Sequence, residues 1–523
     1  MSFFNRVKKL FNKYYLSEEE SNFIKLNSQQ WSDLSRPDSV GSILIEGFLD
    51  SPTSIVEKAR LAKAAQVATG LPIKVFVRGL VDRTSNVIPI YKSFKIEEFY
   101  NWWRNYVNPN IVFPAIVKTL IVVFVNKTGE RLVNYSINNL QVGDLIYDSL
   151  VRNIPNSYSI KKLNIFTHGR IIFRAFCFYY SNKKIIQKNN ASILVTSHNV
   201  YSEYGMMCRQ IHHHGGIVLL KDMDVYKLYT PDGNINEHFL KIKNDDFDYF
   251  LKNSDMENEK KYFMSRVLGI NDQVDVINAY KDKKKYSREE TLKITNKLDK
   301  DKKNVFVMAH AFSDAPHVGE GILFLDYYDF LEKTLIRLNG NENINCFVKS
   351  HPSSYMWGEK GGVETIIEQN NLNRIVILPS DYSSASIIDS ADYIVTAKGT
   401  AGIEFSCAGI PAVTAGKGYY YGFGICIEPN DVEEYYRVLD DITNIEPLDH
   451  DKIKRAHIVL YHSFNNLYHS DVLPKRQIRP GDDYNSLFRL KYKEMGNNIQ
   501  SGINMKDDFY NKVIDDVKRA RSE

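Results

Sequence analysis

The sequence has few of the features that mark secreted, membrane-spanning or nucleic-acid-binding proteins. Its 523 residues contain five cysteines, an odd number without regular spacing, which argues against a disulfide framework and favours reduced thiols in the cytosol. The formal net charge is only +4, so no nucleic-acid partner is indicated. The first residues do not combine a basic stretch, an apolar stretch and a cleavage site of small residues in that order. We therefore expect a cytoplasmic protein without a secretion signal.

Long apolar runs are also missing. The longest, residues 111–125, is shorter than a membrane span and is interrupted by Pro114 and Lys118, so we interpret it as a buried helix or strand. Hydrophobic residues at 43% and charged residues at 25% are ordinary values for a globular protein. Because a chain of this length exceeds what one hydrophobic core usually serves, we predict two domains with a cleft between them.

The first fifteen residues form an amphipathic pattern. Such a helix could lie in the interface of the cytoplasmic membrane, or it could dock on its own domain, and the pattern fits both. The first alternative predicts a peripheral location on the inner face of that membrane. The apolar side chains that share one helical face are Phe3, Phe4, Val7, Leu10, Phe11, Tyr14 and Tyr15, and four cations lie mostly elsewhere.

Apolar runs that alternate with helical stretches predict a parallel α/β architecture throughout the chain. In the second half the alternation is tighter, as in a doubly wound sheet. In the first half the runs expected to be strands are 42–48, 71–80, 163–170, 191–198 and 215–222. In the second half they are 304–310, 345–352, 374–379, 392–396 and 410–416.

Composition also suggests where the domains begin and end. The chain is rich in Lys, Asp, Glu and Asn between about residues 245 and 303, which marks a boundary. We predict an N-terminal segment at 1–35, a first Rossmann-like domain at 36–300 and a second at 301–430. Residues 431–523 are expected to form helices that pack back on the first domain.

Polar residues follow four successive strands of the second half. Ligands bind beyond the carboxyl ends of the strands in an open α/β sheet, so these loops predict one shared site. Small residues at a helix start expose N–H groups, and the helix dipole there favours a phosphate. Each loop alone also fits ordinary turn and capping chemistry. The residues are His310, Ser313, Asp314, His351, Ser383, Ser384, Gly399 and Thr400.

Acidic and histidine side chains in the first half are candidates for catalysis. Asp144 and Asp148 are four residues apart, hence on one face of a helix that Arg152 continues. A carboxylate there could deprotonate a substrate hydroxyl, or Asp148 could pair with Arg152 while Asp144 caps the helix. His168 and His198 follow predicted strands, where cleft residues belong. We expect Asp148 or His198 to take the proton.

Further acidic residues are candidates for nucleotide and metal binding. Glu404 lies one turn into the helix that follows Thr400, where its carboxylate could accept hydrogen bonds from ribose hydroxyls. Asp222 and Asp224 form an Asp-x-Asp pattern, which some transferases use to hold a divalent ion. Because three residues are a weak signal, we interpret this pair as solvated. We therefore expect a metal-independent site without another cofactor.

Two stretches of the second half, 347–352 and 390–416, resemble the donor-binding domain of capsule and lipopolysaccharide biosynthesis glycosyltransferases. They read FVKSHP and SADYIVTAKGTAGIEFSCAGIPAVTAG. Residues 141–152, 195–220 and 310–335 resemble that family as well. The resemblance implies an α/β fold of the GT-B type, with two Rossmann-like domains facing a central cleft. It further implies that the nucleotide lies in the C-terminal domain and the acceptor mostly on the N-terminal one.

The resemblance also implies a donor and individual residue roles. In related transferases of CMP-activated acidic sugars, a His-Pro pair contacts the nucleotide and a later Ser-Ser pair binds its phosphate, which here implies His351, Pro352, Ser383 and Ser384. The expected reaction moves an acidic sugar, such as Kdo or a nonulosonic acid, from CMP to a surface polysaccharide or a lipid-linked glycan. A UDP-sugar donor, a nucleotide-sugar 2-epimerase activity and a non-catalytic assembly subunit are the alternatives.

Overall fold

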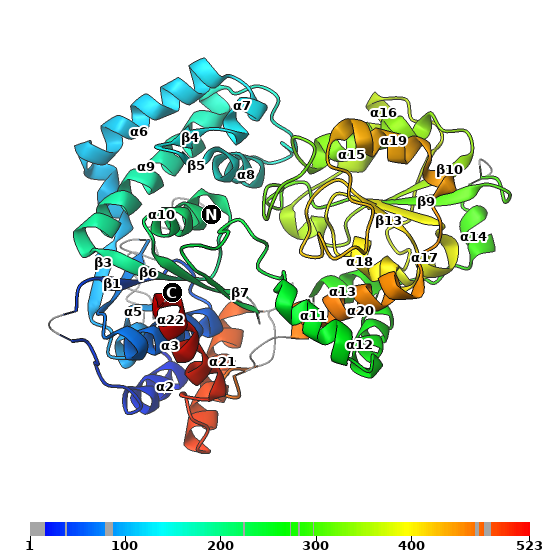
Figure 1. Ribbon diagram of the computed structural model, residues 1–523. Coiled ribbons are helices and arrows are strands. Elements are labelled where there is room, and N and C mark those ends of the chain that lie inside the picture. Colours follow the sequence, from blue (N-terminus) through cyan, green and yellow to red (C-terminus); the bar gives the residue numbers. More distant parts are fainter. Residues whose placement is uncertain are drawn as a thin grey trace.

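The computed structural model describes residues 16–522 apart from 37–38, 79–86, 223–224, 272–273, 281–282, 296–297, 466–469 and 475–482. The amphipathic segment at residues 1–15 therefore lies outside the described residues, as does Asp224. Within them the chain forms two lobes, each built on one sheet with helices around it (Figure 1). The predicted α/β architecture of two Rossmann-like domains, the GT-B type, is confirmed.

The first lobe is built on a six-stranded sheet of order β3-β2-β1-β6-β7-β8. Neighbouring strands pair in parallel except for the antiparallel pair β7–β8 at one edge. The predicted strands at 42–48, 71–80, 191–198 and 215–222 are confirmed. The strands are β1 (Ser42–Glu46), β2 (Ile73–Val77), β3 (Glu98–Asn101), β6 (Ala191–Thr196), β7 (Ile217–Asp222) and β8 (Val225–Tyr229).

The strand predicted at residues 163–170 is wrong, because these residues begin the long helix α9 (Ile165–Asn189). The side chain of Asn164 caps this helix, accepting hydrogen bonds from the backbone N–H groups of Phe166 (2.8 Å) and Thr167 (3.3 Å). An apolar run this short has no period that separates a strand from a helix. The Asn164 cap directly before the run stabilises a helix at this position.

Helices cover both faces of the first sheet. On one face α2 packs on α21 and α3 packs on α22, so the C-terminal helices lie against the first lobe. These four are α2 (Glu18–Ser28), α3 (Pro52–Thr69), α21 (Tyr484–Gln500) and α22 (Asp508–Ser522), with α5 (Val87–Ser93) beside them. The other core contains α6 (Pro109–Ile121), α7 (Gly129–Val133), α8 (Gly143–Asn153), α9 and α10 (Met206–His213).

Short elements connect these helices. They are η1 (Trp102–Val107), η2 (Val122–Asn126), β4 (Ser136–Ile137), β5 (Leu140–Gln141) and η3 (Tyr201–Gly205). In the second lobe η4 (Ser354–Trp357) follows β10, and η5 (Ile442–Asn444) follows α19. Strands β4 and β5 pair with each other alone, as a two-stranded antiparallel sheet.

The second lobe is built on a five-stranded parallel sheet of order β11-β10-β9-β12-β13. All five strands predicted in this half are confirmed. They are β9 (Lys303–Met308), β10 (Ile344–Lys349), β11 (Ile375–Ile377), β12 (Tyr393–Thr396) and β13 (Ala412–Thr414). The helices around it are α15 (Tyr327–Asn339), α16 (Gly362–Gln369), α17 (Ala385–Ser390), α18 (Ala401–Cys407) and α19 (Val432–Asp440).

The chain enters the second lobe soon after β8. Phe247 and Phe263, from helices that the sequence-based boundary at residue 300 places in the first domain, share a hydrophobic core with Ile403 of the second lobe. Helices α11 and α12 lie against α20, and α14 lies against α17. The helices are α11 (Asn244–Asn253), α12 (Glu257–Val267), α13 (Val274–Tyr280), α14 (Arg288–Leu292) and α20 (His450–Asn465).

The longest apolar run forms helix α6 and its continuation η2 at the edge of the first lobe (Figure 1). Residues Pro109–Asn126 are apolar and long enough to cross a membrane, judged by composition and length alone, and 28% of them are buried. The interpretation as a helix is thus confirmed, whereas the expected burial is wrong. Only an inner row that includes Ile111, Ala115 and Thr119 faces the lobe.

Candidate functional site

Helix α8 brings Asp148 to the boundary between the two lobes. The carboxylate accepts a hydrogen bond from Nδ1 of His317 (2.6 Å) and a longer one from the backbone N–H of the same residue (3.3 Å). His317 lies in the loop after β9, so each lobe contributes one partner. The side chains are only 2% and 10% exposed. The boundary therefore holds a buried carboxylate–imidazole pair.

The pair sets the charge of His317. Burial opposes the imidazolium, but the Asp148 carboxylate and its hydrogen bond outweigh burial and hold the pKa of His317 above its ordinary value of 6.5. A second basic side chain, Lys398, also interacts with Asp148. Burial lowers the pKa of Lys398 to about 8, and the negative charge of Asp148 opposes this shift. The ammonium of Lys398 donates to the carbonyl of Val318 (2.5 Å). The Asp148 carboxylate thus favours the charged forms of both His317 and Lys398.

His310 lies at the same edge of the second sheet, directly after β9. Its ring stacks on Tyr327 with centroids 4.0 Å apart, and its Nε2 accepts a hydrogen bond from the backbone N–H of Lys398 (3.2 Å). Burial, followed by the charges of His351 and Lys398, holds the pKa of His310 well below its ordinary value. The imidazole is therefore neutral. A Cβ at Gly399 would lie 3.2 Å from the same nitrogen, so glycine permits this close approach.

The other residues predicted in these loops have partners of their own. Ser313 donates from its backbone N–H (2.8 Å) and its hydroxyl (2.7 Å) to the carboxylate of Glu359. Asp314 accepts a hydrogen bond from the Tyr201 hydroxyl of the first lobe (3.3 Å). Nδ1 of His351, before Pro352, accepts one from the backbone N–H of Ser353 (3.2 Å). The four-loop prediction thus brings His310, His351 and Gly399 to one edge, and Asp314 to the boundary between the lobes.

Ser383 and Ser384 lie at the start of α17 and are buried. Their backbone N–H groups donate to carbonyls of the segment before the second sheet, Ser383 to Lys284 (2.9 Å) and Ser384 to Ala279 (3.2 Å). The Ser383 hydroxyl accepts from the N–H of Ala385 (3.2 Å). Phosphate binding by this pair remains a prediction from the resemblance.

Glu404 lies in α18, which begins after Thr400 as predicted. Its carboxylate accepts hydrogen bonds from the Arg266 guanidinium (2.7 Å from Nε) and from the Tyr280 hydroxyl (3.2 Å). The side chains of Arg266 and Glu404 are 4% and 10% exposed. Both carboxylate oxygens therefore have protein partners, from helices α12 and α13. The predicted contact with ribose stays a prediction.

The alternative interpretation of α8, in which Asp148 pairs with Arg152 and Asp144 caps the helix, does not match the contacts of Asp144 and Arg152. Asp144 forms a bidentate ion pair with Arg209 of α10, with both distances 2.6 Å. The N-cap position is Val142, which makes no side-chain capping hydrogen bond. The guanidinium of Arg152 lies over the Trp357 ring of the second lobe, 4.5 Å from its centroid. Asp144 thus fixes α8 on α10, and Arg152 contacts the opposite lobe.

A cavity of about 720 Å³ opens in the first lobe next to this boundary. Three arginines line it, namely Arg152, Arg170 and Arg174, together with aromatic and polar side chains that include His198 and Tyr201. His198 packs its ring edge-to-face against Tyr204, with centroids 5.2 Å apart. His168 has a local role, because its Nδ1 accepts from the backbone N–H of Asn164 at the start of α9 (2.8 Å).

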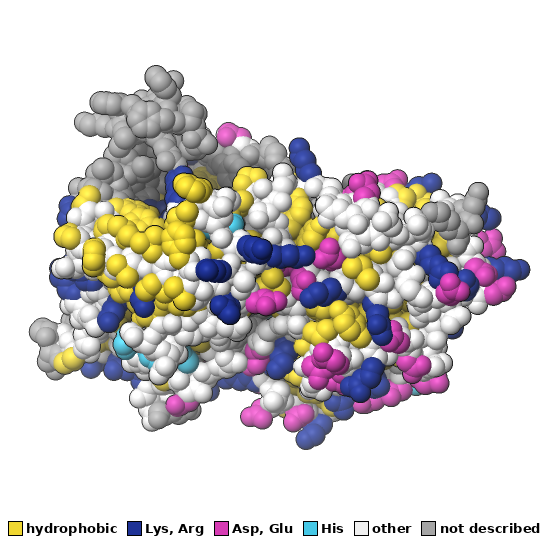
Figure 2. All heavy atoms as spheres, turned by 90° about the horizontal axis from the view of Figure 1, so that it is seen from above, with side chains coloured by type: hydrophobic (Ala, Val, Ile, Leu, Met, Phe, Trp, Pro, Cys, Tyr) yellow, Lys and Arg dark blue, Asp and Glu magenta, His cyan; other side chains and the backbone are white. Residues whose placement is uncertain are grey.

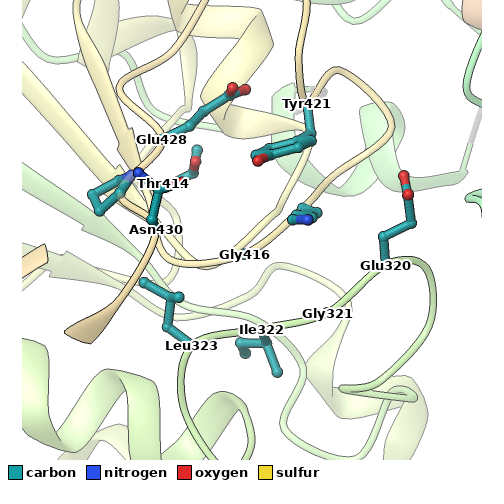
Figure 3. Close-up of a pocket in the computed structure, with 11 residues that line it drawn as sticks. Glu320, Gly321, Ile322, Leu323, Thr414, Gly416, Tyr421, Glu428 and Asn430 are labelled. Atoms are coloured by element: carbon teal, nitrogen blue, oxygen red, sulfur yellow. The ribbon is translucent and has the colours of Figure 1, made fainter. Parts of the chain in front are cut away.

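A second cavity, of about 210 Å³, lies beyond β13 in the second lobe. Figure 3 shows Glu428 and Tyr421 on one side of it and Ile322 and Leu323 on the other. Burial raises the pKa of Glu428 to about 7. None of the residues predicted to bind the nucleotide lines this cavity, so it is not the site predicted from the four loops.

Metal ligands are not gathered in the part of the chain that the structure describes, where no group of three or more His, Cys, Asp or Glu side chains is placed to hold an ion. Asp224 and the side chain of Asp222, which form the Asp-x-Asp pattern, lie outside the described residues. Metal independence of the site therefore remains a prediction.

Sequence reasoning missed two residues at the centre of the boundary, His317 and Lys398. Each stands in a stretch that the sequence singled out, His317 seven positions after His310 and Lys398 directly before Gly399. The signal was a second histidine and a lysine in loops that already looked like ligand-binding loops. Tyr327, which stacks on His310, starts α15 and carried no such signal.

Two facing Rossmann-like lobes with a polar boundary at their strand ends define the GT-B class of α/β proteins. Residues 232–436 match a family model described as "Capsule polysaccharide biosynthesis protein". The match begins in the loop after β8 and ends within α19, so it covers most of the second lobe. The resemblance to capsule polysaccharide biosynthesis proteins is thereby confirmed for this part of the chain.

Solved structures with a similar course of the chain include KpsC of Thermosulfurimonas dismutans, a beta Kdo 2,4 transferase, at 11% identity, with 51% of this chain and 79% of that chain covered and a TM-score of 0.28. An O-GlcNAc transferase of Thermobaculum terrenum is 10% identical, with 97% of this chain and 76% of that chain covered and a TM-score of 0.28. A putative UDP-N-acetylglucosamine 2-epimerase of Listeria monocytogenes is 11% identical, with 82% of this chain and 98% of that chain covered and a TM-score of 0.27. Likeness this weak carries no information on activity. A comparison with curated protein sequences found no match.

Proposed function

We propose that this protein is a glycosyltransferase of surface polysaccharide synthesis that moves a sugar from a nucleotide donor to a glycan at the boundary between the lobes. One observation carries the proposal: Asp148 of the first lobe and His317 of the second form a buried pair beside His310 and Lys398. A sugar transfer needs a proton acceptor and groups that stabilise a departing phosphate. This boundary offers both.

The proton acceptor in this proposal is His317. Asp148 occupies Nδ1 and fixes the ring, which leaves Nε2 for the acceptor hydroxyl. Asp148 is then a positioning residue rather than the base itself, and His198 has the place of a cavity residue that contacts the acceptor. The raised pKa of His317 makes its neutral form a stronger base than an ordinary histidine.

The departing nucleotide would face the strand ends of the second lobe. Lys398 is largely protonated at neutral pH, because its pKa is about 8, and it supplies positive charge without a metal ion. His351 and the loop from Gly399 to Thr400 lie at the same edge and supply hydrogen-bond donors. A buried, preorganised site of this kind stabilises developing negative charge more strongly than water does.

The finer identities of donor and acceptor are part of the proposal. The His351–Pro352 and Ser383–Ser384 pairs favour a CMP-linked acidic sugar, with a UDP-sugar as the alternative donor. The cavity lined by three arginines favours an acceptor that carries phosphate or acidic sugars, including a lipid-linked glycan. Such an acceptor would place the enzyme in the cytoplasm, at the inner face of the membrane.

The experiment is a nucleotide-release assay with CMP-Kdo, CMP-N-acetylneuraminate and UDP-N-acetylglucosamine, each with and without an acidic oligosaccharide. We expect acceptor-dependent release from one donor, and a rate at least about 100-fold lower in His317→Asn, since a general base contributes that much. His213→Asn, at an exposed histidine, is the matched control. Epimerised donor without any acceptor, or no reaction with any donor, would contradict the proposal.

A further inference from the structure

The outer side of α6 and η2 is an exposed apolar surface. Phe113 is 70% exposed, Phe124 56% and Val125 61%, and the remaining members are more than one-third exposed. Figure 2 shows a broad hydrophobic patch on the upper face of the first lobe. Single exposed apolar side chains are normal, whereas a contiguous patch marks an interaction surface. This α6 face comprises Val107, Phe113, Ile116, Val117, Leu120, Ile121, Phe124 and Val125.

The opposite side of the same helix holds it on the lobe. Ile111 and Ala115 are almost fully buried, and α6 packs along α9. The Thr119 hydroxyl donates to the Ala115 carbonyl (2.7 Å), so this polar group is satisfied inside the helix. A helix fixed along one side and apolar along the other lies on a surface instead of crossing a membrane.

The segments that form and adjoin the α6 face carry an excess of positive charge. Residues 99–129 include Arg104, Lys118 and Lys127 but no Asp or Glu, and residues 149–202 include eight Lys and Arg and again no acidic residue. Helix α9 lies within the second stretch. Among the described residues Arg104, Lys118 and Lys127 form no ion pair with a carboxylate, whereas Lys161 and Arg174 of the second stretch pair with Glu332 (3.6 Å) and Glu203 (3.5 Å). Lys and Arg side chains lie beside the patch in Figure 2.

We propose that the α6 face docks the first lobe on a bilayer that contains anionic lipids. The apolar side chains would enter the boundary between headgroups and acyl chains, and the surrounding cations would pair with lipid phosphates. Two stretches that carry cations and no acidic residue match a uniformly anionic surface, whereas a protein partner usually presents both signs. The face is distinct from residues 1–15, and its docking does not depend on the proposed enzymatic activity.

Docking at this face would bring the arginine-lined cavity to the membrane. Phe178, which lines that cavity, stacks on Trp102 at the start of η1, with ring centroids 4.0 Å apart. The η1 segment leads directly into α6, so the cavity and the face are joined through one packed layer. A lipid-linked acceptor would then reach the cavity without leaving the bilayer surface, a consequence that rests on the proposed function.

The test is cosedimentation of the full chain with vesicles of phosphatidylcholine alone and of equal parts phosphatidylcholine and phosphatidylglycerol. We expect binding to the anionic vesicles, weakened by salt, and an affinity at least about tenfold lower in the double variant Phe113→Gln, Phe124→Gln. Both side chains are exposed, so the fold should persist. The matched control changes Tyr249 and Ile270, equally exposed in the second lobe, to Gln.

Three results would overturn the proposal. The first is binding of the double variant as tight as that of the unaltered chain, and the second is loss of all vesicle binding on deletion of residues 1–15 alone. The third is a change of oligomeric state in the double variant without any vesicle binding in the unaltered chain, which would assign the α6 face to a protein contact. Nucleotide release with a soluble acceptor should be the same in both Gln variants, which separates this test from that of the proposed function.

Discussion

The buried ion pair between Arg266 and Glu404 gives Glu404 a role in stability, whereas the sequence predicted that this residue binds the nucleotide. The two roles predict different effects of the same substitution. In Glu404→Ala the guanidinium of Arg266, whose side chain is 4% exposed, would lose its carboxylate partner. The Tyr280 hydroxyl would lose its acceptor as well. A buried charge that loses its opposite charge is costly even where other contacts remain, such as that of the guanidinium with the Tyr262 hydroxyl (3.3 Å), so we expect a large loss of stability.

The size of this loss follows from the burial of the pair. Breaking a buried ion pair by removing one partner costs about 3–5 kcal/mol, and 1 kcal/mol lowers the Tm of a unit the size of this lobe by about 2–4 °C. The unfolding transition of the second lobe should therefore fall by about 6–20 °C. Glu404→Gln, which keeps an acceptor oxygen for Arg266 and Tyr280, should lose less.

Differential scanning calorimetry measures the effect. The matched control is Glu342→Ala, whose partner Arg374 is exposed; such surface pairs contribute about 0–1 kcal/mol, so its Tm should barely change. The double variant Arg266→Met, Glu404→Leu should regain much of the loss, because no charge is left buried. An unchanged Tm in Glu404→Ala, together with loss of nucleotide binding, would refute this reasoning and assign the carboxylate to the ligand.

Three further predictions concern the boundary between the lobes. Asp148→Asn should move the acidic limb of the rate–pH profile to lower pH, since the carboxylate that raises the pKa of His317 is lost while burial and the charge of Lys398 still lower it; in the unaltered chain this limb should lie above 6.5. An unmoved limb would exclude His317 as the titrating group. His351→Ala should weaken nucleotide binding at least about tenfold by calorimetric titration, whereas His213→Ala should leave it unchanged. Sugar transfer should survive EDTA, and loss of activity restored by Mn²⁺ would instead favour a metal at Asp222 and Asp224.

The fold could be predicted from the sequence because its signals are local. Each strand of the second sheet is a short apolar run followed by small or polar residues, and the structure has a strand at every one of them. The failure at residues 163–170 has the same cause. An apolar run this short fits a strand or a helix, and the one local feature that distinguishes them is Asn164, which caps the helix.

The partners across the site could not be predicted, because they are set by distances along the chain that leave no pattern. Glu404 meets Arg266, 138 positions earlier, and Asp148 meets His317, 169 positions later. A loop sequence indicates which residues stand at a strand end, but not which residue of the other lobe will face them. Burial of Lys398 and exposure of α6 likewise depend on how the lobes and helices pack.

The measurement that tests the glycosyltransferase proposal most directly is the mass of the acceptor glycan after incubation with donor. We predict a gain of one sugar residue per molecule of nucleotide released, with the gain reduced at least about 100-fold in His317→Asn and unchanged in His213→Asn. Nucleotide release without any gain in glycan mass, or a full gain in His317→Asn, would contradict sugar transfer at the Asp148–His317 boundary.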